Sequence, residues 1–520
     1  MAELNRRRLL QAGLVTAAGV ATAAAGATHA VAEAAPRREP RLSGGDAAFL
    51  THGLQHLAWL TTAEATSPDG IALPRPTARQ FASSGFTQPC YYTAGPDGMY
   101  DTTYQHAAHR RLWSVAQFPT GRQQQGQPAD SGHIVGPPPP ADELLSPAMH
   151  ANLDAMFSAC FGDEEGYSSQ LVDWLSEYYA AMRSIAPHVL CYNNQWAGEW
   201  SDEQLRHYIR TSKPDLINWD SYYFAPGSPW SSGSVTPLYS RTYRYRQLAL
   251  EGLDGSGREP INFGTYTQGF QGDPWPPVEM YIPSESQLTL VSFVAWAMGA
   301  KLLDLFRWTW MQPYPQYGLV NYLDGRTTPI YRTYQQLNTA MAALSPYLTR
   351  LRTHSVSIRR GMTGDPADPR TTDKSTVPDW TPAVDRNAGI SNLEVTNVGG
   401  ANQGLPGDVL VGTFRTLPGL SRHNLQGVVQ QDSTAIMLVN ALAMPRRDTT
   451  HWNAPGGSGA ETRQRVRVTV HRHPGRDGQL SRINIHTGRA TPVAARRTHV
   501  DSWTFDEAID GGQGVLLVWT

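Results

Sequence analysis

Cysteine is scarce in this chain of 520 residues, which contains only Cys90, Cys160 and Cys191. No two of them form a CxxC pair, so the usual zinc and thioredoxin-like motifs are excluded. An odd number also excludes a framework in which every cysteine is bridged, although a Cys160–Cys191 disulfide stays open as one pairing after export. We expect Cys160 and Cys191 to lie inside the protein as small apolar side chains.

The chain also has no large excess of charge of either sign. Charged residues make up 17% of the sequence, and the formal net charge is −2. This balance gives no electrostatic basis for binding nucleic acid or an anionic membrane surface. No GxGxxG follows the first predicted strand and no GxxxxGK[ST] occurs, so the glycine-rich cradles for nucleotide phosphates are missing. We therefore expect neither a cofactor nor a nucleic-acid partner.

No apolar run is suited to a stable membrane span. The N-terminal run Ala12–Ala27 is short and alanine-rich. It follows a twin arginine, Arg6 and Arg7, and it precedes the small-residue cleavage patterns "THA" and "AEA". Charged, apolar and small-residue regions in this order predict a twin-arginine export signal over residues 1–34, with a polar linker over 35–45. We expect a protein that is secreted or retained in the periplasm or cell envelope.

Short apolar runs alternate with longer amphipathic helical stretches between residues 46 and 345. The predicted strands are Leu54–Thr61, Gly85–Thr93, Arg111–Phe118, Ala155–Phe161, His188–Asn194, Asp215–Phe224, Pro260–Tyr266 and Ala300–Trp308. Strand–helix alternation is typical of a mostly parallel sheet covered by helices, and eight such units in about 300 residues predict a (β/α)8 barrel. An open, doubly wound sheet is the alternative.

The pattern of apolar and polar residues changes after residue 345. Residues 346–520 carry short β-rich runs, among them "DVLVGTF", "AIMLVNAL" and the strictly alternating "RVRVTV". This pattern predicts a C-terminal β-sandwich. A stretch at about 361–407 is rich in Pro, Gly, Asp and Thr, and it predicts a long irregular insertion within that domain.

The active site of a (β/α)8 barrel lies at the C-terminal ends of its strands. In this chain those ends carry carboxylates, amides and aromatics, with no Ser–His–Asp order, no Cys–His pair and no cluster of histidines. Such residues suit a cleft that cleaves sugars, because amides bind hydroxyls and a carboxylic acid can protonate a glycosidic oxygen. The predicted substrate contacts are Asp163, Asn194, Trp196, Trp219, Tyr223, Tyr266, Gln268, Trp308 and Trp310. For Trp219, Tyr223 and Trp308, packing in the core is the alternative.

Three consecutive acids, Asp163, Glu164 and Glu165, follow the fourth predicted strand in "CFGDEEGYSSQ". Crowded carboxylates raise the proton affinity of one of them. We predict that Glu164 is the catalytic acid, with Glu165 as its substitute. The alternative is that the acidic run only complements the N-terminus of the following helix.

Asp220 is the predicted second carboxylate, as nucleophile or as base toward water. It lies inside "LINWDSYYF", an otherwise apolar strand. A charge there is costly unless it is paired or functional. A structural aspartate bonded to the barrel backbone is the alternative, and we expect Asp304, in "LLDLF", to be structural.

Several stretches resemble, in order, the motifs of bacterial (β/α)8 glycoside hydrolases with a C-terminal β-sandwich. "FGDEEGYS" is similar to the acid motif after strand four of such enzymes, and "KPDLINWDSYYF" is similar to their strand-six motif. "AWAMGAKLLDLFRWTW" resembles their eighth strand, and "GDVLVGTF" with "GVLLVWT" resembles their terminal sandwich. The resemblance implies a metal-independent glycosidase in which Glu164 is the usual proton donor.

The chain departs from that family at the end of strand seven, where the clan that includes β-galactosidases and cellulases places a nucleophilic glutamate. "NFGTYTQGF" has no acid there, so Asp220, Asp273 and Glu279 are rivals for the second role. The departure motivates an alternative function: a secreted carbohydrate-binding or envelope protein on a catalytically silent scaffold. A metal-dependent hydrolase that uses Asp163 is a third reading.

Overall fold

The computed structural model describes residues 42–61, 78–92, 112–116, 134–224, 235–270, 272–275, 278–280, 282–308, 318–320, 325–382, 389–425, 427–429, 434–450, 454–471 and 479–519. Residues 41–520 form one compact unit. The predicted export signal, Trp310 and the side chains of Asp273 and Glu279 lie outside the described residues.

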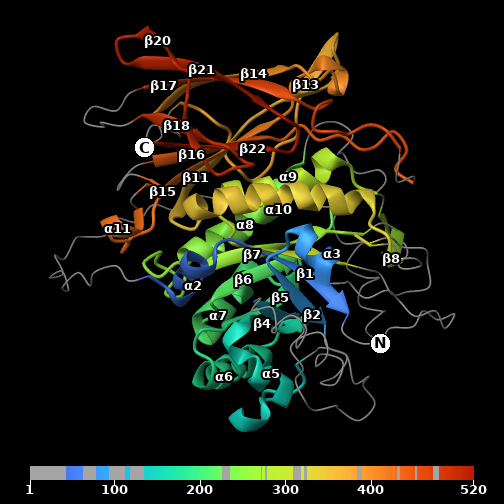
Figure 1. Cartoon of the computed structure of the whole chain (residues 1–520), viewed down its shortest axis with the longest axis vertical. Helices are drawn as coiled ribbons and strands as arrows, with labels where there is room; N and C mark the ends of the chain where they lie inside the picture. Colours follow the sequence, from blue (N-terminus) through green and yellow to red (C-terminus); the bar gives the residue numbers. More distant parts are fainter. Residues whose placement is uncertain are drawn as a thin grey trace, which may run out of the picture. The chain divides into compact units, whose positions relative to one another are not determined.

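Eight parallel strands close into a barrel in the order β1-β10-β7-β6-β5-β4-β3-β2. Figure 1 shows part of this barrel with the helices around it. They are β1 (Gln55–Thr61), β2 (Gln88–Tyr92), β3 (Trp113–Ala116), β4 (Met156–Asp163), β5 (Leu190–Trp196), β6 (Leu216–Asp220), β7 (Asn262–Gln268) and β10 (Leu302–Phe306). Each coincides with one of the predicted apolar runs. The barrel prediction is therefore confirmed, and closure of the sheet rules out the open, doubly wound alternative.

Helices connect and cover the strands. They are α2 (Gly44–His52), α3 (Ala78–Ser84), α5 (Pro147–Ala151), α6 (Ser169–Ile185), α7 (Asp202–Ser212), α8 (Thr236–Glu251), α9 (Glu285–Met298) and α10 (Pro329–Leu348). Serine caps fix several starts: Ser168 accepts from Leu171 N–H, and Ser201 forms a capping box with Gln204. Short 3-10 turns occur at Ala141–Glu143, Leu153–Ala155 and Asn402–Gly404, and a small β8–β9 ribbon spans Gly272–Trp275 and Val278–Met280. Among the helices of the described segments, none is both long and apolar enough to cross a bilayer.

Two antiparallel sheets follow the barrel and confirm the predicted sandwich. The first runs β11 (Leu351–Arg359), β15 (Val409–Thr416), β16 (Thr434–Asn440), β22 (Gly514–Trp519), β18 (Leu480–Ile483) and β19 (Ala490–Pro492). The second runs β14 (Ile390–Asn397), β17 (Gln464–His471), β21 (Ser502–Ile509) and β20 (Arg496–His499). Val466, Val468 and Val470 are buried and alternate with less buried residues, as the pattern predicts. A β12–β13 hairpin (Met362–Asp365, Asp368–Thr371) and the short α11 (Arg422–Leu425) complete the domain.

The prediction of an irregular insertion at 361–407 is wrong for β14, which pairs with β17 along its length. The register shifts between Ile390 and Asn392, so the buried residues Ile390 and Leu393 are three positions apart instead of two. This bulge breaks the alternation by which a strand is recognised in sequence.

The open Cys160–Cys191 pairing is also wrong, because the three cysteines are free and buried. Ala159, not Cys160, is the register partner of Cys191 on the neighbouring strand. Adjacent positions on a strand face opposite sides of the sheet. Cys160 therefore packs inside the barrel, whereas Cys191 packs against the helices outside it.

Helix α9 lies between the barrel and the sandwich, in contact with β7, β11, β15 and β16 (Figure 1). The approach is closest at Gly412 of β15, where an added Cβ would lie 2.2 Å from the Ala297 carbonyl oxygen. We expect Gly412→Ala to lower the free energy of unfolding by about 1–3 kcal/mol, because backbone atoms must move apart. Urea unfolding measures this change.

Gly136→Ala is the matched control, since no atom lies within 4 Å of an added Cβ at Gly136. If Gly412→Ala were as stable as Gly136→Ala, the barrel and the sandwich would not be held at the close distance described here.

Candidate active site

The acidic run lies at the end of β4, where the strand bulges. The register between β4 and β5 shifts between Cys160 and Asp163, and Gly162 and Glu164 have positive φ angles of 77° and 52°. Bulges near the rims of barrels re-aim side chains. Here the bulge separates Asp163 and Glu164, which approach Asp220, from Glu165, which does not.

Asn194, near the end of β5, links the carboxylates of two different strands. Its Nδ2 donates to Asp163 Oδ1 at 2.8 Å and to Asp220 Oδ1 at 3.1 Å. Asp220 is only 5% exposed. Burial raises the pKa of Asp220 well above its usual range, and the charges of Glu164 and Asp163 act in the same direction. Folding therefore favours the protonated form of Asp220.

The Glu164 and Asp220 carboxyls are hydrogen-bonded to each other. The structure thus brings together the two acids on which the sequence prediction depends. We call these two acids the Glu164–Asp220 pair.

Glu165 has a different environment from its two neighbours. Its buried carboxylate accepts from the Ile134 N–H at 3.1 Å and from Asn193 Nδ2 at 3.0 Å. Its Oε1 would lie 2.0 Å from a Cβ added at Gly162, so the glycine makes room for it. These contacts tie the end of β4 to β5 and to the preceding segment. We therefore assign Glu165 to positioning the strand end and withdraw it as the substitute acid.

Glu199 is a carboxyl of this region that the sequence analysis missed. It lies three residues beyond Trp196, the last residue of β5, in a tight turn. Burial raises the pKa of Glu199 to about 8, and the charges of Glu164, Glu165 and Asp163 act in the same direction. In the sequence, Glu199 lies between two tryptophans in "QWAGEW", a few residues beyond the predicted end of the fifth strand.

Two aromatic side chains near these carboxyls, Trp196 and Tyr222, are partly exposed. The Arg241 guanidinium lies 5.9 Å from the centroid of the Trp196 ring. Tyr222, which directly follows Ser221 after β6, packs edge-to-face on Phe270 with ring centroids 4.8 Å apart. Although part of the ring is exposed, its hydroxyl is shielded from water, and this shielding and the nearby charge of Asp220 raise the pKa of Tyr222.

Trp219 and Trp308 are core residues, and their predicted contact with substrate is wrong. Both are 0% exposed and belong to the cluster between the barrel and its helices. Trp219 stacks on Tyr245 with centroids 4.2 Å apart, and Trp308 packs against Phe81 at 5.5 Å. The cause for Trp219 is alternation, because Asp220 faces the barrel interior and its neighbour must face outward. Tyr223 is buried as well, beneath the Arg241 guanidinium at 5.7 Å.

The remaining predicted contacts lie in the barrel interior. Tyr266 is buried and its hydroxyl accepts from Trp59 Nε1 at 3.1 Å. Gln268 Nε2 donates to the Phe270 carbonyl at 3.2 Å, so its amide is held by the backbone. Asp304 is fully buried, and burial raises its pKa well above the usual range. All three side chains are buried.

Within the described ranges, no group of three or more His, Cys, Asp or Glu side chains is placed to hold a metal ion. Asp163 and Asp220 accept hydrogen bonds from Asn194, and Glu164 interacts with Asp220.

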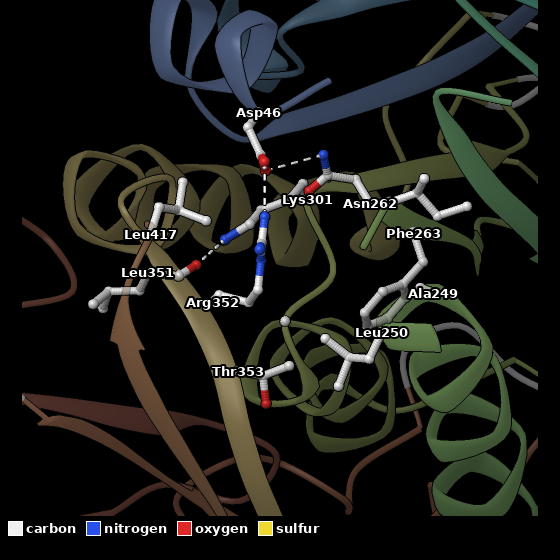
Figure 2. A pocket seen from close by; sticks show the side chains of 12 residues that line it. Asp46, Ala249, Leu250, Asn262, Phe263, Lys301, Leu351, Arg352, Thr353 and Leu417 are labelled. Atoms are coloured by element: carbon white, nitrogen blue, oxygen red, sulfur yellow. Dashed lines mark hydrogen bonds and ion pairs between the residues drawn. The ribbon is translucent and has the colours of Figure 1, made fainter. Parts of the chain in front are cut away.

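A separate hollow lies at the opposite end of the barrel strands (Figure 2). Lys301, just before β10, donates to the Leu351 carbonyl at 2.7 Å, and burial lowers its pKa to about 7. Asp46 accepts from Arg352 Nη2 at 2.8 Å and from Asn262 Nδ2 at 3.3 Å. These bonds tie the N-terminal ends of the strands to β11. The N-terminal face of such barrels serves stability, so we assign this hollow to the junction between barrel and sandwich.

No family model and no curated protein matches the chain. A Paenibacillus sp. cycloisomaltooligosaccharide glucanotransferase structure is 9% identical with a TM-score of 0.45, over 90% of this chain and 85% of that chain. A family 51 α-L-arabinofuranosidase from Bifidobacterium longum is 9% identical with a TM-score of 0.39, over 95% and 100%. An FMN-binding β-glucuronidase from Facaelibacterium prausnitzii L2-6 is 8% identical with a TM-score of 0.37, over 70% and 54%, so the chain spans about half of that protein. The fold assignment rests on the strand order and register described above.

Proposed function

We propose that the protein is a glycoside hydrolase whose chemistry takes place at the C-terminal ends of β4, β5 and β6. The observation that carries the proposal is the Glu164–Asp220 pair, in which carboxyls from two strands share a hydrogen bond at the barrel mouth. Cleavage of a glycosidic bond commonly needs one protonated and one ionised carboxyl group. Burial of Asp220 favours its protonated form, with the Glu164 carboxyl beside it.

The surrounding residues suit a sugar. Trp196 and Tyr222 offer half-exposed rings of the kind on which a pyranose or furanose stacks. Asn194 holds Asp163 and Asp220 with its amide nitrogen, which fixes the direction of both carboxyls. A polysaccharide, or an oligosaccharide derived from one, is the proposed substrate. The twin-arginine pattern supports action outside the cytoplasm.

The test is a screen of purified wild-type protein against polysaccharides and aryl glycosides. We expect new reducing ends, or released aryl alcohol, in at least one reaction, and the same rate after treatment with a chelator. A double variant, Glu164→Gln with Asp220→Asn, purified in parallel, separates this activity from a contaminating hydrolase.

Glycan affinity in calorimetry with no new reducing ends after prolonged incubation would instead identify a binding protein on a silent scaffold. Activity lost on chelation and restored by a divalent metal would identify the metal-dependent alternative.

A further inference from the structure

The turn after β5 fixes the carboxyl of Glu199 at the strand end. The Gly198 and Glu199 N–H groups both donate to the Trp196 carbonyl, at 2.7 and 3.0 Å. The Trp196 N–H in turn contacts the Glu199 carboxyl. Glu199 Oε2 is buried and has no hydrogen-bond partner among the described residues. One oxygen is therefore anchored by backbone while the other has an unused hydrogen-bonding capacity.

Charged and titratable groups face Glu199 from two elements. They are Glu164, Glu165 and Asp163 at the end of β4, and Tyr245 on α8. Arg241 and Arg244 on α8 contact the neighbouring Trp196 ring and Ala197 carbonyl. Glu164 exerts the largest of the charge effects on Glu199. The cations are engaged elsewhere: Arg244 donates to Asp202 Oδ1 and to the Trp200 carbonyl, both at 2.6 Å, and Arg241 donates to Ser221 Oγ. No described cation forms a salt bridge with Glu199, so its environment favours the protonated carboxyl.

A second, independent feature indicates that a ligand binds beside these acids. Asn194 is 2% exposed, and its Nδ2 lies between Asp163 and Asp220. Its Oδ1 is buried and has no partner in the described part of the chain. A buried amide oxygen without a partner is costly, so a hydroxyl group of a bound molecule would relieve it.

We propose that Glu199 is the proton donor to the leaving glycosidic oxygen, acting together with the Glu164–Asp220 pair. This inference rests on the proposed glycosidase function and assigns its acid to a different residue from the sequence prediction. Glu199 lies outside the Glu164–Asp220 pair, so the pair can supply the ionised carboxyl while Glu199 supplies the proton.

The step balances as an ordinary hydrolysis. The bond between the anomeric carbon and the leaving oxygen breaks, and the Glu199 proton passes to that oxygen. Glu164 either takes a proton from the attacking water or attacks the anomeric carbon before water does. In both routes the hydroxyl of water ends on the anomeric carbon, and its second proton returns to the carboxyls.

The test compares two aryl glycosides of one sugar, with a good leaving group (2,4-dinitrophenol) and a poor one (phenol). For Glu199→Gln we expect kcat/KM to fall about 10²-fold or more with phenol and less than about 10-fold with dinitrophenol, because only the poor leaving group needs a proton. The wild-type rate should also fall as pH rises through about 8, and this basic limb should disappear in the variant. Glu203→Gln, an exposed acid on α7, is the matched control and should change neither.

The leaving-group ratio is measured within one preparation, so partial misfolding of the variant does not alter it. Equal losses on both substrates with the basic limb retained would overturn the role of Glu199 while leaving the proposed function intact. If Glu199→Gln is not recovered in soluble form, the wild type alone decides. Its rate above pH 8 must fall more steeply with phenol than with dinitrophenol, and parallel profiles would overturn the inference. Failure of the wild type to cleave any glycoside would count against the proposed function itself.

Discussion

Replacing Asp220 with asparagine should lower kcat by about 10³-fold or more while making the protein more resistant to unfolding at neutral pH. Asparagine has the shape of a protonated aspartate, so it can accept from Asn194 and donate to Glu164 as Asp220 does. It cannot exchange that proton. Removing an acid–base group of this kind commonly lowers the rate by about 10²–10⁴-fold. Loss of a fixed neighbour for Glu164 lowers the rate further. Kinetics on an aryl glycoside and thermal unfolding measure the two effects.

The sign of the stability change follows from the raised pKa of Asp220. Below about pH 4 the folded and unfolded chains both hold the proton, so variant and wild type should differ least there. Above that pH the unfolded chain releases the proton more readily than the folded chain, because folding raises the pKa of Asp220, so wild-type stability falls as pH rises. Each unit by which folding raises the pKa corresponds to about 1.4 kcal/mol. The advantage of Asp220→Asn should therefore grow between pH 4 and pH 7.

Asp173→Asn, on the exposed face of α6, is the control, with neither effect expected. Full activity in Asp220→Asn would remove this residue from the mechanism. A variant less stable than wild type at pH 7 would show that Asp220 is an ionised structural aspartate.

Replacing Trp219 with alanine should lower the free energy of unfolding by about 3–5 kcal/mol, the usual cost of emptying a large aromatic site in a core. Its ring is fully buried and stacked between Tyr245 and Phe263. Urea unfolding measures the loss. The milder Trp219→Phe should keep the KM for glycan unchanged, because the ring lies outside the barrel wall and touches no substrate.

Trp196→Ala provides the opposite pattern, since that ring is half-exposed beside the carboxyls. It should raise KM with a smaller loss of stability. If Trp219→Phe raised KM as much as Trp196→Ala, the original prediction of Trp219 as a sugar-stacking ring would stand.

The sequence predicts the barrel well because each strand is an apolar run that must be buried on both faces. Which face each residue takes is harder, because it depends on register. Trp219 and Asp220 are neighbours in one strand, and only the closed sheet decides that the acid faces inward. The structure places Glu164 beside Asp220 because both lie at strand ends on the same rim.

The remaining features of the site depend on local backbone conformation, which the spacing of apolar residues does not predict. The bulge at Gly162 turns Glu165 away from Glu164 although the two are adjacent. Glu199 returns to the rim through a turn of hydrogen bonds to Trp196. Neither the positive φ of Glu164 nor that turn follows from residue type, so strand-end reasoning alone stops short of them.

The burial of α9 bears on whether the C-terminal domain can be separated from the barrel. Every residue of α9 from Ser286 to Met298 is shielded from solvent. A chain cut at the end of α10 would expose Phe293 and its neighbours, which now pack under the sandwich. Loss of that cover would leave a sticky, aggregation-prone helix on the barrel. The sandwich is therefore part of the same folding unit as the barrel, because it covers a helix that the barrel alone would leave exposed.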